Sequence, residues 1–329
     1  MSEQFAKTRT LILVNHPGRQ KREDFEEIQA KIEALAPEID VQIADATKSA
    51  DELDEAIWQR PCLIVSFGLL QPFRPKHGLI YCCRPIPKFE QLVKLNRANL
   101  PVPVSAQLVF GKPLNRRFWG PLVVLKPTTP GFMSQGAVFL MRTERVADLA
   151  EGVFPFGHPS RRLPVLVQQF VDTGEWPSYY RVLTLFGESL YCRKAFTPEP
   201  RPPLDASDEV LLKARIATNV ESSTRRQHHA ASDTDVLDLA RRAYAAMPAI
   251  PLQGVDIIRE AATGRLFVLE INAGGNTWHF SSSYIEERRK ALPPEEQHKY
   301  FTREERITQF GAWDVAARIL IKKTREEAQ

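Results

Sequence analysis

Two apolar stretches that carry carboxylates decide the fold: Gly254-Val255-Asp256-Ile257-Ile258 and Leu266-Phe267-Val268-Leu269-Glu270-Ile271-Asn272. Their length and their apolar, β-branched residues predict the two strands of a β-hairpin. Side chains alternate between the faces of a strand, so Glu270 and Asn272 share one face and Leu269 faces the opposite way. A carboxylate therefore stands in an otherwise apolar strand.

The turn of this hairpin decides which residues face one another. With a five-residue loop from Ala261 to Arg265, the antiparallel register places Asp256 directly opposite Glu270. Asp256, Glu270 and Asn272 would then form an oxygen-rich site suited to Mg²⁺, which keeps several waters and also binds nucleotide phosphates. The sequence leaves one alternative open, in which nearby arginines neutralise the two carboxylates on an exposed sheet face.

A second segment joins two predicted strands through a polar loop: Leu125-Lys126-Pro127-Thr128-Thr129-Pro130-Gly131-Phe132-Met133-Ser134-Gln135-Gly136-Ala137-Val138. A loop with Ser134 and Gly136 can point backbone N–H groups at phosphate oxygens, because glycine lets the backbone come close. The chain contains neither GxxxxGK[ST] nor GxGxxG. A plain hairpin with a polar loop explains this segment equally well.

The first 86 residues alternate predicted strands and helices. The strands are Leu11 to Val14, Val41 to Ile43 and Cys62 to Phe67, and the helices are Asp24 to Leu35 and Ala50 to Trp58. This alternation predicts a small parallel α/β domain over residues 1–86. The basic segment His16 to Arg22 follows the first strand, where such sheets place ligands, although a solvated turn is the alternative.

The remainder of the chain predicts an α+β arrangement. The expected helices are Phe89 to Leu95, Val236 to Ala246 and Trp313 to Lys323, and the expected strands besides the hairpin are Leu122 to Lys126, Ala137 to Met141, Pro164 to Phe170, Tyr180 to Phe186 and Ser189 to Phe196. The segment 222–229, with Arg225-Arg226 and His228-His229, is expected to be a loop, either over a bound ligand or simply solvated. Trp278-His279-Phe280 is expected either in the core or beside a substrate.

The composition is that of an ordinary globular protein, with 43% hydrophobic and 26% charged residues and a net charge of 44 − 40 = +4. These values exclude collagen-like, coiled-coil and wholly disordered chains. Basic residues occur in scattered pairs, so no nucleic-acid partner is expected.

The start of the chain has no long apolar run, so we expect a cytoplasmic protein without a membrane partner. The four cysteines form no CxxC motif and indicate neither disulfides nor zinc.

The motifs between about Lys88 and Asn272, taken in their order along the chain, resemble those of the ATP-grasp superfamily. The resemblance implies ATP bound between two α+β subdomains, with two Mg²⁺ ions on its phosphates and Mn²⁺ as an alternative ion. It therefore implies a small N-terminal parallel α/β domain at 1–86 and an ATP-grasp domain at 87–329. The latter would comprise an ATP-binding subdomain at about 87–170 and a C-terminal metal-binding and catalytic subdomain at about 171–329.

The resemblance also implies roles for particular residues. Lys88 and Lys126 match the family's basic phosphate contacts, and Ser134 and Gly136 lie in its phosphate loop. The run from Val165 to Val171 is similar to the hinge strand that reads adenine. The residues implied around the nucleotide and the metal are Gln168, Gln169, Phe170, Val171 and Glu175 for the base and ribose, and Asp256, Glu270 and Asn272 for the ions.

Within the superfamily, the chain most resembles the ribosomal-protein glutamate ligases and bacterial glutathione synthetases. Arg181 and Arg193 match arginines of that branch and are the implied catalytic residues. On the same matching, residues implied at the substrate are Asn219, Arg225, Gly274 and Gly275. The chain departs from the branch here, since its Arg-x-Asn motif would need Arg at Ala217, and its Asn-x-x-Pro-Gly motif appears as Asn272-Ala273-Gly274-Gly275.

The implied activity is that of an ATP-dependent ligase, which activates a carboxylate as an acyl phosphate and joins it to the amine of an amino acid, peptide or related small molecule. Two alternatives stay open, an ATP-grasp kinase that phosphorylates a hydroxyl and a nucleotide-binding protein without turnover. The sequence names neither the acid nor the acceptor, and it leaves a homo-oligomer as one option.

Overall fold

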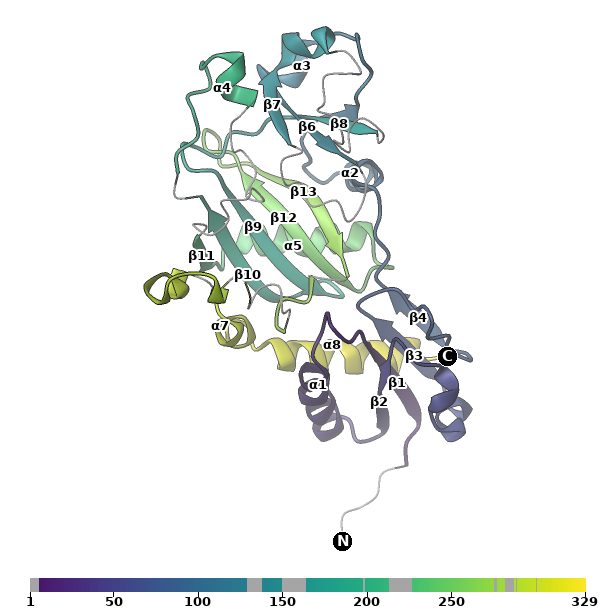
Figure 1. Ribbon diagram of the computed structural model, residues 1–329. Helices are drawn as coiled ribbons and strands as arrows, with labels where there is room; N and C mark the ends of the chain where they lie inside the picture. Colours follow the sequence, from purple (N-terminus) through teal and green to yellow (C-terminus); the bar gives the residue numbers. More distant parts are fainter. Residues whose placement is uncertain are drawn as a thin grey trace.

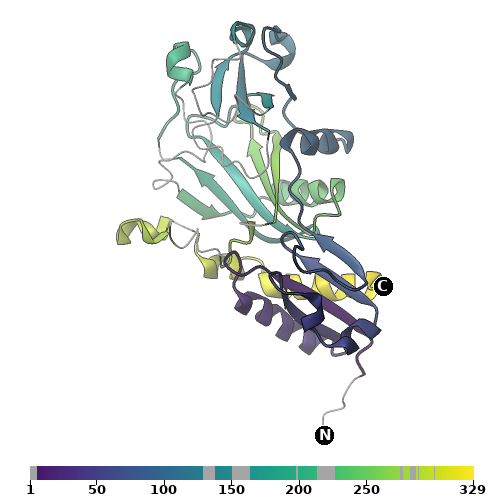
Figure 2. The ribbon, with the colours of Figure 1, turned by 45° about the vertical axis from the view of Figure 1, so that its right-hand side comes forward.

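The computed structural model describes residues 6–128, 138–149, 164–197, 199–212, 227–274, 277–281, 287, 289–299 and 301–329. Three β-sheets follow one another along the long direction of the molecule, as Figures 1 and 2 show. One sheet is parallel and two are antiparallel, which confirms the predicted mixture of α/β and α+β architecture. None of the helices in the described ranges combines the length and apolar character needed to cross a bilayer.

The N-terminal sheet has the order β2-β1-β3-β4 and is parallel throughout. Its elements are β1 (Arg9–Asn15), α1 (Arg22–Leu35), β2 (Ile39–Asp45), β3 (Cys62–Ser66) and β4 (Leu79–Cys82). The predicted helix from Ala50 to Trp58 is wrong, because two short 3₁₀ helices, Ala50–Glu52 and Glu55–Gln59, stand there. The Asp54 side chain accepts a hydrogen bond from Ala56 N–H and starts a new turn, which interrupts one continuous helix.

The last helix of the chain returns to this first sheet. α8 (Ala312–Glu327) packs against α1, β1 and β3, and it buries Ala316, Ala317 and Leu320. Beyond it, the backbone N–H of Cys62 donates to the Gln329 carbonyl at 2.8 Å. Figure 1 shows α8 lying between the N-terminal sheet and the central sheet. The two ends of the sequence therefore share one hydrophobic core.

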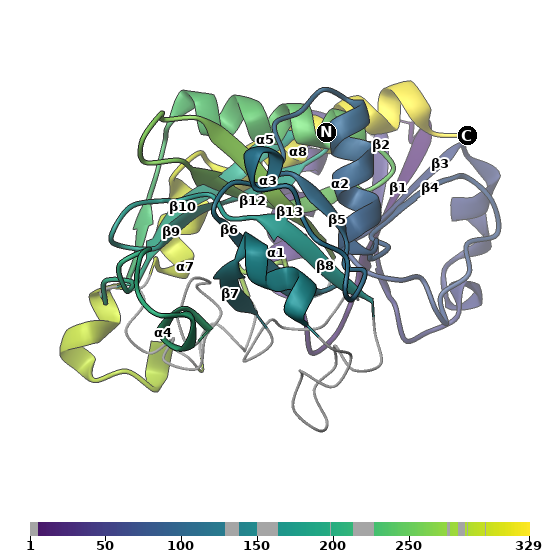
Figure 3. The same ribbon diagram turned by 90° about the horizontal axis from the view of Figure 1, so that it is seen from above.

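The upper sheet has the order β5-β8-β6-β7 and is antiparallel. Its strands are β5 (Ser105–Gln107), β6 (Leu122–Pro127), β7 (Phe139–Arg142) and β8 (Val165–Gln169), and its helices are α2 (Lys88–Arg97), α3 (Arg116–Trp119) and α4 (Asp208–Leu212). A further 3₁₀ helix follows β7 at Thr143–Asp148. Trp119, Val123, Leu125 and Val167 form a separate small core. This sheet stacks over the central one when the molecule is seen from above (Figure 3).

The central sheet has the order β11-β10-β9-β12-β13 and is antiparallel. Its strands are β9 (Ser178–Leu185), β10 (Glu188–Phe196), β11 (Gln227–Ala230), β12 (Leu252–Arg259) and β13 (Leu266–Ala273). One face is covered by α5 (Thr234–Ala246), whose buried residues are Val236, Leu239, Ala240 and Ala243. A 3₁₀ helix, Pro294–Lys299, and α7 (Arg303–Thr308) connect this sheet to α8.

The predicted register of the β12–β13 hairpin is confirmed, but the predicted length of its loop is wrong. Asp256 lies directly opposite Glu270, but the connection runs from residue 260 to residue 265 and is one residue longer than expected. Ile257 pairs with Val268, so Leu269 is an extra residue and forms a β-bulge that restores the register. The prediction that Leu269 faces away from Glu270 is wrong, because both side chains line the same cleft.

Trp278 joins the segment after β13 to the N-terminal sheet. Its ring stacks on Phe67 with a centroid distance of 4.8 Å, and its Nε1–H donates to Asp24 Oδ2 at 2.7 Å. Asp24 is fully buried on α1 and also accepts from Arg303 at 2.5 Å. The interpretation that residues 278–280 pack in the core therefore holds for Trp278 and Phe280.

Gly274 brings the end of β13 against the N-terminal sheet. Its backbone has φ +65°, and a Cβ atom there would lie 2.5 Å from Cys83 Cβ and 2.7 Å from the Phe67 carbonyl oxygen. No side chain fits that space, so the position requires glycine for its conformation and for its close contact. The structure therefore gives Gly274 a packing role at this junction.

This junction predicts a difference between two Gly→Ala variants. Gly264→Ala should lower the free energy of unfolding by about 1–2 kcal/mol, because Gly264 has φ +72° and open space around it. Gly274→Ala should cost a further ~1–3 kcal/mol through steric overlap. Urea unfolding of both variants measures the two costs, and equal values would show that the close contact at Gly274 does not matter.

Candidate active site

A cleft with about 940 Å³ of empty space, part of it open to solvent, lies between the upper and central sheets. Eight of the residues predicted from the sequence line it: Lys88, Lys126, Gln168, Gln169, Phe170, Val171, Asp256 and Glu270. They come from α2, β6, the end of β8, β12 and β13. Segments that lie far apart in the sequence therefore meet at one place.

One end of the cleft is apolar. Val124, Val171, Tyr179 and Ile258 line it together with Leu269, which the bulge in β13 turns inward. The described residues offer no hydrogen bond to the Val171 N–H. Apolar lining beside a backbone N–H that has no partner among the described residues suits an aromatic ring with polar edges, such as a nucleobase.

The other end of the cleft carries two lysines. Lys88, at the start of α2, places Nζ 2.5 Å from Glu270 Oε2. Lys126, near the end of β6, is buried and makes no ion pair within the described ranges. Burial lowers the pKa of Lys126 and the Lys88 charge lowers it further, to about 8, even though Glu270 and Asp256 act in the opposite direction. This end is suited to a bound anion.

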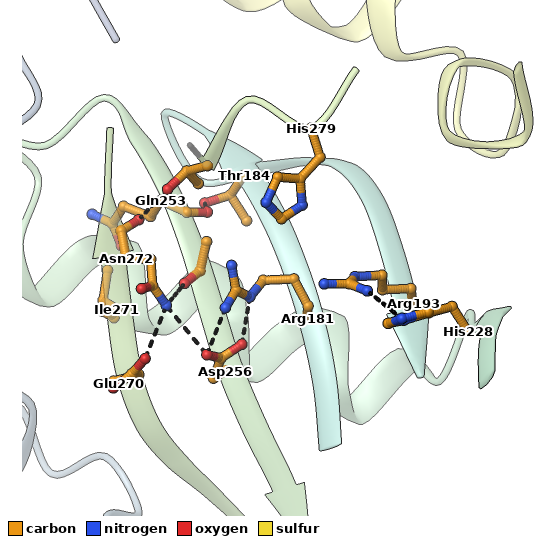
Figure 4. Close-up of polar contacts among 12 residues, drawn as sticks. Arg181, Thr184, Arg193, His228, Gln253, Asp256, Glu270, Ile271, Asn272 and His279 are labelled. Atoms are coloured by element: carbon orange, nitrogen blue, oxygen red, sulfur yellow. Dashed lines mark hydrogen bonds and ion pairs between the residues drawn. The ribbon is translucent and has the colours of Figure 1, made fainter. Parts of the chain in front are cut away.

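Four charged residues form a row across the central sheet. Arg193 on β10 lies opposite Arg181 on β9, Arg181 lies opposite Asp256 on β12, and Asp256 lies opposite Glu270 on β13. Arg181 grips Asp256 with two hydrogen bonds, one from Nε to Oδ1 and one from Nη2 to Oδ2 at 2.7 Å (Figure 4). Within the row Asp256 is paired with Arg181, whereas Glu270 takes its counter-charge from Lys88 outside the row.

The two carboxylates have different electrostatic surroundings. Burial alone would raise the pKa of Glu270, but the charges of Lys88, Lys126 and Arg181 lower it to about 2. Burial raises the pKa of Asp256, and the facing Glu270 charge adds to this, while Arg181 opposes both. Glu270 is therefore ionised at any physiological pH.

Asn272 completes the acidic group. Its Nδ2 donates to Asp256 Oδ2 at 3.2 Å and to Glu270 Oε1 at 3.3 Å, so the amide stands between the two carboxylates (Figure 4). Turning this amide by half a rotation presents its oxygen to the same point. Gly254 leaves room for the arginine, since a Cβ there would lie 3.2 Å from Arg181 Nη1.

The donor set fits Mg²⁺ in the company of a phosphate. Asp256, Glu270 and Asn272 offer only oxygen ligands once the amide turns, which is the preference of this ion. Across the described residues, no group of three or more His, Cys, Asp or Glu side chains could hold a metal by itself. An ion here would take its other ligands from water and phosphate. The alternative interpretation, in which arginines pair with both carboxylates on an exposed face, is met only for Asp256, because Glu270 pairs with Lys88 and both pairs are largely buried.

The chain was compared with known proteins. No protein-family model and no curated protein matches it. D-cycloserine synthetase DcsG superposes with a TM-score of 0.51 at 15% identity, over 96% of this chain and 99% of the synthetase. The ATP-grasp ligase PsnB, complexed with minimal precursor, Mg and ADP, superposes with a TM-score of 0.51 at 17% identity, over 96% and 98% of the two chains. The chain has the ATP-grasp fold.

Within this ATP-grasp fold, several predicted residues do not line the cleft or are not described by the structure. Glu175 is exposed on the loop after β8 and does not line the cleft. Arg181 lies beside Asp256 on the central sheet and Arg193 lies on the far side of Arg181, and neither arginine lines the cleft. The predicted residues Ser134, Gly136, Asn219, Arg225 and Gly275 fall outside the described ranges.

The sequence missed Arg201, which lines the cleft. Its guanidinium donates to Asp172 Oδ1 at 2.7 Å and to the Gly174 carbonyl at 3.0 Å, and so holds the loop after β8. Arg201 comes from a proline-rich connection in which no periodic pattern marks any residue. His228-His229 is also not the expected loop, because these residues belong to the edge strand β11.

Lys126 should titrate in the ATP-grasp cleft at an unusually low pH. In ¹³C-lysine-labelled protein, we expect its side-chain resonance, identified by its loss in Lys126→Met, to titrate near pH 8. Glu270→Gln should lower that midpoint further, because the Glu270 charge raises it. Between pH 8 and its ordinary pKa of 10.5 the unfolded chain binds more protons, so this lysine makes the unfolding free energy rise with pH there. A midpoint near 10.5 would contradict the burial of its charge.

Proposed function

We propose that the protein is an ATP-dependent ligase that activates a carboxylate as an acyl phosphate with MgATP and joins it to an amine. The observation that carries this proposal is the cleft of the ATP-grasp fold, which has an apolar end beside a free backbone N–H and a charged end with Lys88, Lys126, Asp256 and Glu270. One cavity thus offers separate surroundings for a nucleobase and for metal-bound phosphates.

The apolar end would hold adenine. Val124, Ile258 and Leu269 supply apolar surface for the faces of the ring. The Gln169 carbonyl oxygen and the Val171 N–H would bond the amino edge of the base. Glu175 remains our proposed partner for the ribose hydroxyls, which requires the loop held by Arg201 to move Glu175 toward the cleft.

The charged end would hold the phosphates. Lys88 and Lys126 would bind the α and β phosphates, and an entering phosphate would supply Lys126 with the counter-charge that it lacks among the described residues. Asp256, Glu270 and Asn272 would hold Mg²⁺, an ion that neutralises β and γ oxygens when bound. Catalysis of phosphoryl transfer depends mainly on positioning the phosphates and on neutralising the charge of their oxygens.

The acid substrate would bind beyond the γ phosphate, where Arg193 lies on the same sheet face. Its carboxylate would attack the γ phosphate and release ADP, and an amine would then attack the acyl phosphate to form the amide with release of inorganic phosphate and a proton. This sequence of steps needs no nucleophilic side chain. The cysteines agree with that, since burial raises the pKa of the Cys83 and Cys192 thiols to about 12 and neither residue lines the cleft.

The substrate class stays broad. By its name, the first solved structure is a synthetase of D-cycloserine, and the ligase PsnB has also been solved in complex with a precursor peptide. These names are consistent with substrates that range from small amino-acid-like molecules to peptides. We therefore propose a small-molecule or peptide acid with an amine acceptor.

Hydroxylamine trapping tests the ligase proposal. Protein incubated with ATP, Mg²⁺, hydroxylamine and a library of candidate acids should give a hydroxamate and ADP with at least one acid, because hydroxylamine captures acyl phosphates. Mass analysis identifies the product. If no acid raises ADP release above the acid-free rate, the proposal is refuted. A stable phosphorylated product formed without any amine would instead indicate a kinase.

Glu270→Gln tests the metal assignment. We expect the dissociation constant for MgATP to rise by about tenfold or more, because a charged oxygen ligand is lost. The dissociation constant for ATP in EDTA should not rise, since the change removes a negative charge next to Lys88. Titration calorimetry measures both values, and turnover with MgATP should be abolished.

A control variant separates the metal from general charge effects. Glu188→Gln removes the same charge from an exposed position at the start of β10 and should leave both dissociation constants unchanged. If Glu270→Gln binds MgATP as tightly as Glu188→Gln does, Glu270 does not hold the ion.

A further inference from the structure

Arg193 is a buried cation with few partners. It is 8% exposed, and no carboxylate lies within ion-pair distance of it among the residues that the structure describes. It stands directly opposite Arg181, whose charge Asp256 already neutralises. Its Nε is buried and has no hydrogen-bond partner in the part of the chain that the structure describes. An unpaired buried N–H costs free energy, and an oxygen atom of a bound ligand would accept the missing hydrogen bond.

His228 is the side chain that holds this arginine. Arg193 Nη1 donates to His228 Nδ1, and it also lies 3.5 Å from Nε2 of the same ring (Figure 4). An acceptor at Nδ1 means that this nitrogen carries no proton. His228 is 5% exposed, so water does not replace the contact.

The strand register explains why these two side chains meet. His228 on β11 lies opposite Ala195 on β10, and Ala195 is two residues from Arg193 on the same strand. Cross-strand partners share a face, and so do residues two apart, so all three side chains project from one face. Ala195 is small and fully buried, which leaves room for the guanidinium and the imidazole to meet above it.

The neighbouring residue, His229, makes no contact of this kind with Arg193 and lies on the other face of the sheet. His229 lies opposite Lys194, projects from the other face and stacks on Phe196 with a centroid distance of 5.2 Å. It is exposed. The pair His228-His229 therefore contains one histidine that contacts Arg193 and one that serves as a matched control.

We propose that His228 is a positioning residue that orients Arg193, so that the arginine presents its Nε–H, which has no partner among the described residues, to an oxyanion in the active site. The oxyanion is either the carboxylate of the acid substrate or the transferred phosphoryl group. Only this identity rests on the proposed function. Nδ1 of His228 acts as a neutral acceptor, which fixes the guanidinium without competing for the anion.

Three variants test the role of the acceptor. His228→Phe keeps the ring but removes the acceptor, His228→Asn keeps an acceptor at the position of Nδ1, and His229→Phe keeps the stacking on Phe196 and is the control. With an acid found by hydroxylamine trapping, His228→Phe should raise KM for the acid about tenfold to a hundredfold and leave KM for MgATP within about twofold. His228→Asn and His229→Phe should stay close to wild type, and thermal unfolding checks that each variant is folded.

A binding measurement keeps this test separate from the ligase activity. Inorganic phosphate and, in a second arm, acetate are titrated by calorimetry into protein saturated with MgADP. Binding of phosphate indicates the phosphoryl position and binding of acetate the carboxylate position, and His228→Phe should weaken whichever binds by about tenfold. If no acid is ever activated but this loss appears, the proposed function fails and the positioning role stands.

Three results would overturn the role of His228. One is equal anion affinity and equal KM for the acid in His228→Phe and His229→Phe. Another is an equal loss in His228→Asn and His228→Phe, which would show that the ring volume matters and the acceptor does not. The third is the absence of phosphate and acetate binding to the wild-type protein.

Discussion

The ion pair between Arg181 and Asp256 is the interaction on which the candidate active site depends. Two carboxylates face each other across β12 and β13 on a buried face, and alone they would repel. Arg181 reaches Asp256 from one side and Lys88 reaches Glu270 from the other, so the acidic group is neutralised before any metal arrives. Gly254 is part of this arrangement, because a side chain there would crowd the arginine.

Charge in this region exceeds what the two carboxylates can balance. Lys88, Lys126, Arg181 and Arg193 face Asp256 and Glu270, which leaves an excess of two positive charges among these six residues. Buried cations without partners are costly in a folded protein. Lys126 shows that cost in its lowered pKa, and Arg193 shows it in a buried N–H without an acceptor. Both residues are suited to an anionic ligand.

The geometry of the site relies on contacts made by the N-terminal sheet. β13 ends at Ala273, and Gly274 then touches Phe67 and Cys83 of that sheet. Trp278 stacks on Phe67 and bonds the buried Asp24. The N-terminal sheet therefore supports the end of the strand that carries Glu270 and Asn272, although none of the described residues from 6 to 86 lines the cleft.

The sequence by itself determined the mixed fold, the hairpin and the charged residues Asp256, Glu270 and Lys126, because alternation and isolated charges in apolar strands are local signals. Lys88 was predicted only through the resemblance to the ATP-grasp superfamily, and the turn length predicted for the hairpin was one residue too short. Only the tertiary structure decided that a bulge turns Leu269 into the cleft, that Arg201 holds the loop beside it and that His228 meets Arg193. These contacts join segments whose spacing in the sequence carries no periodic signal. Their partners are set by how strands pair and sheets pack, which single-sequence patterns do not encode.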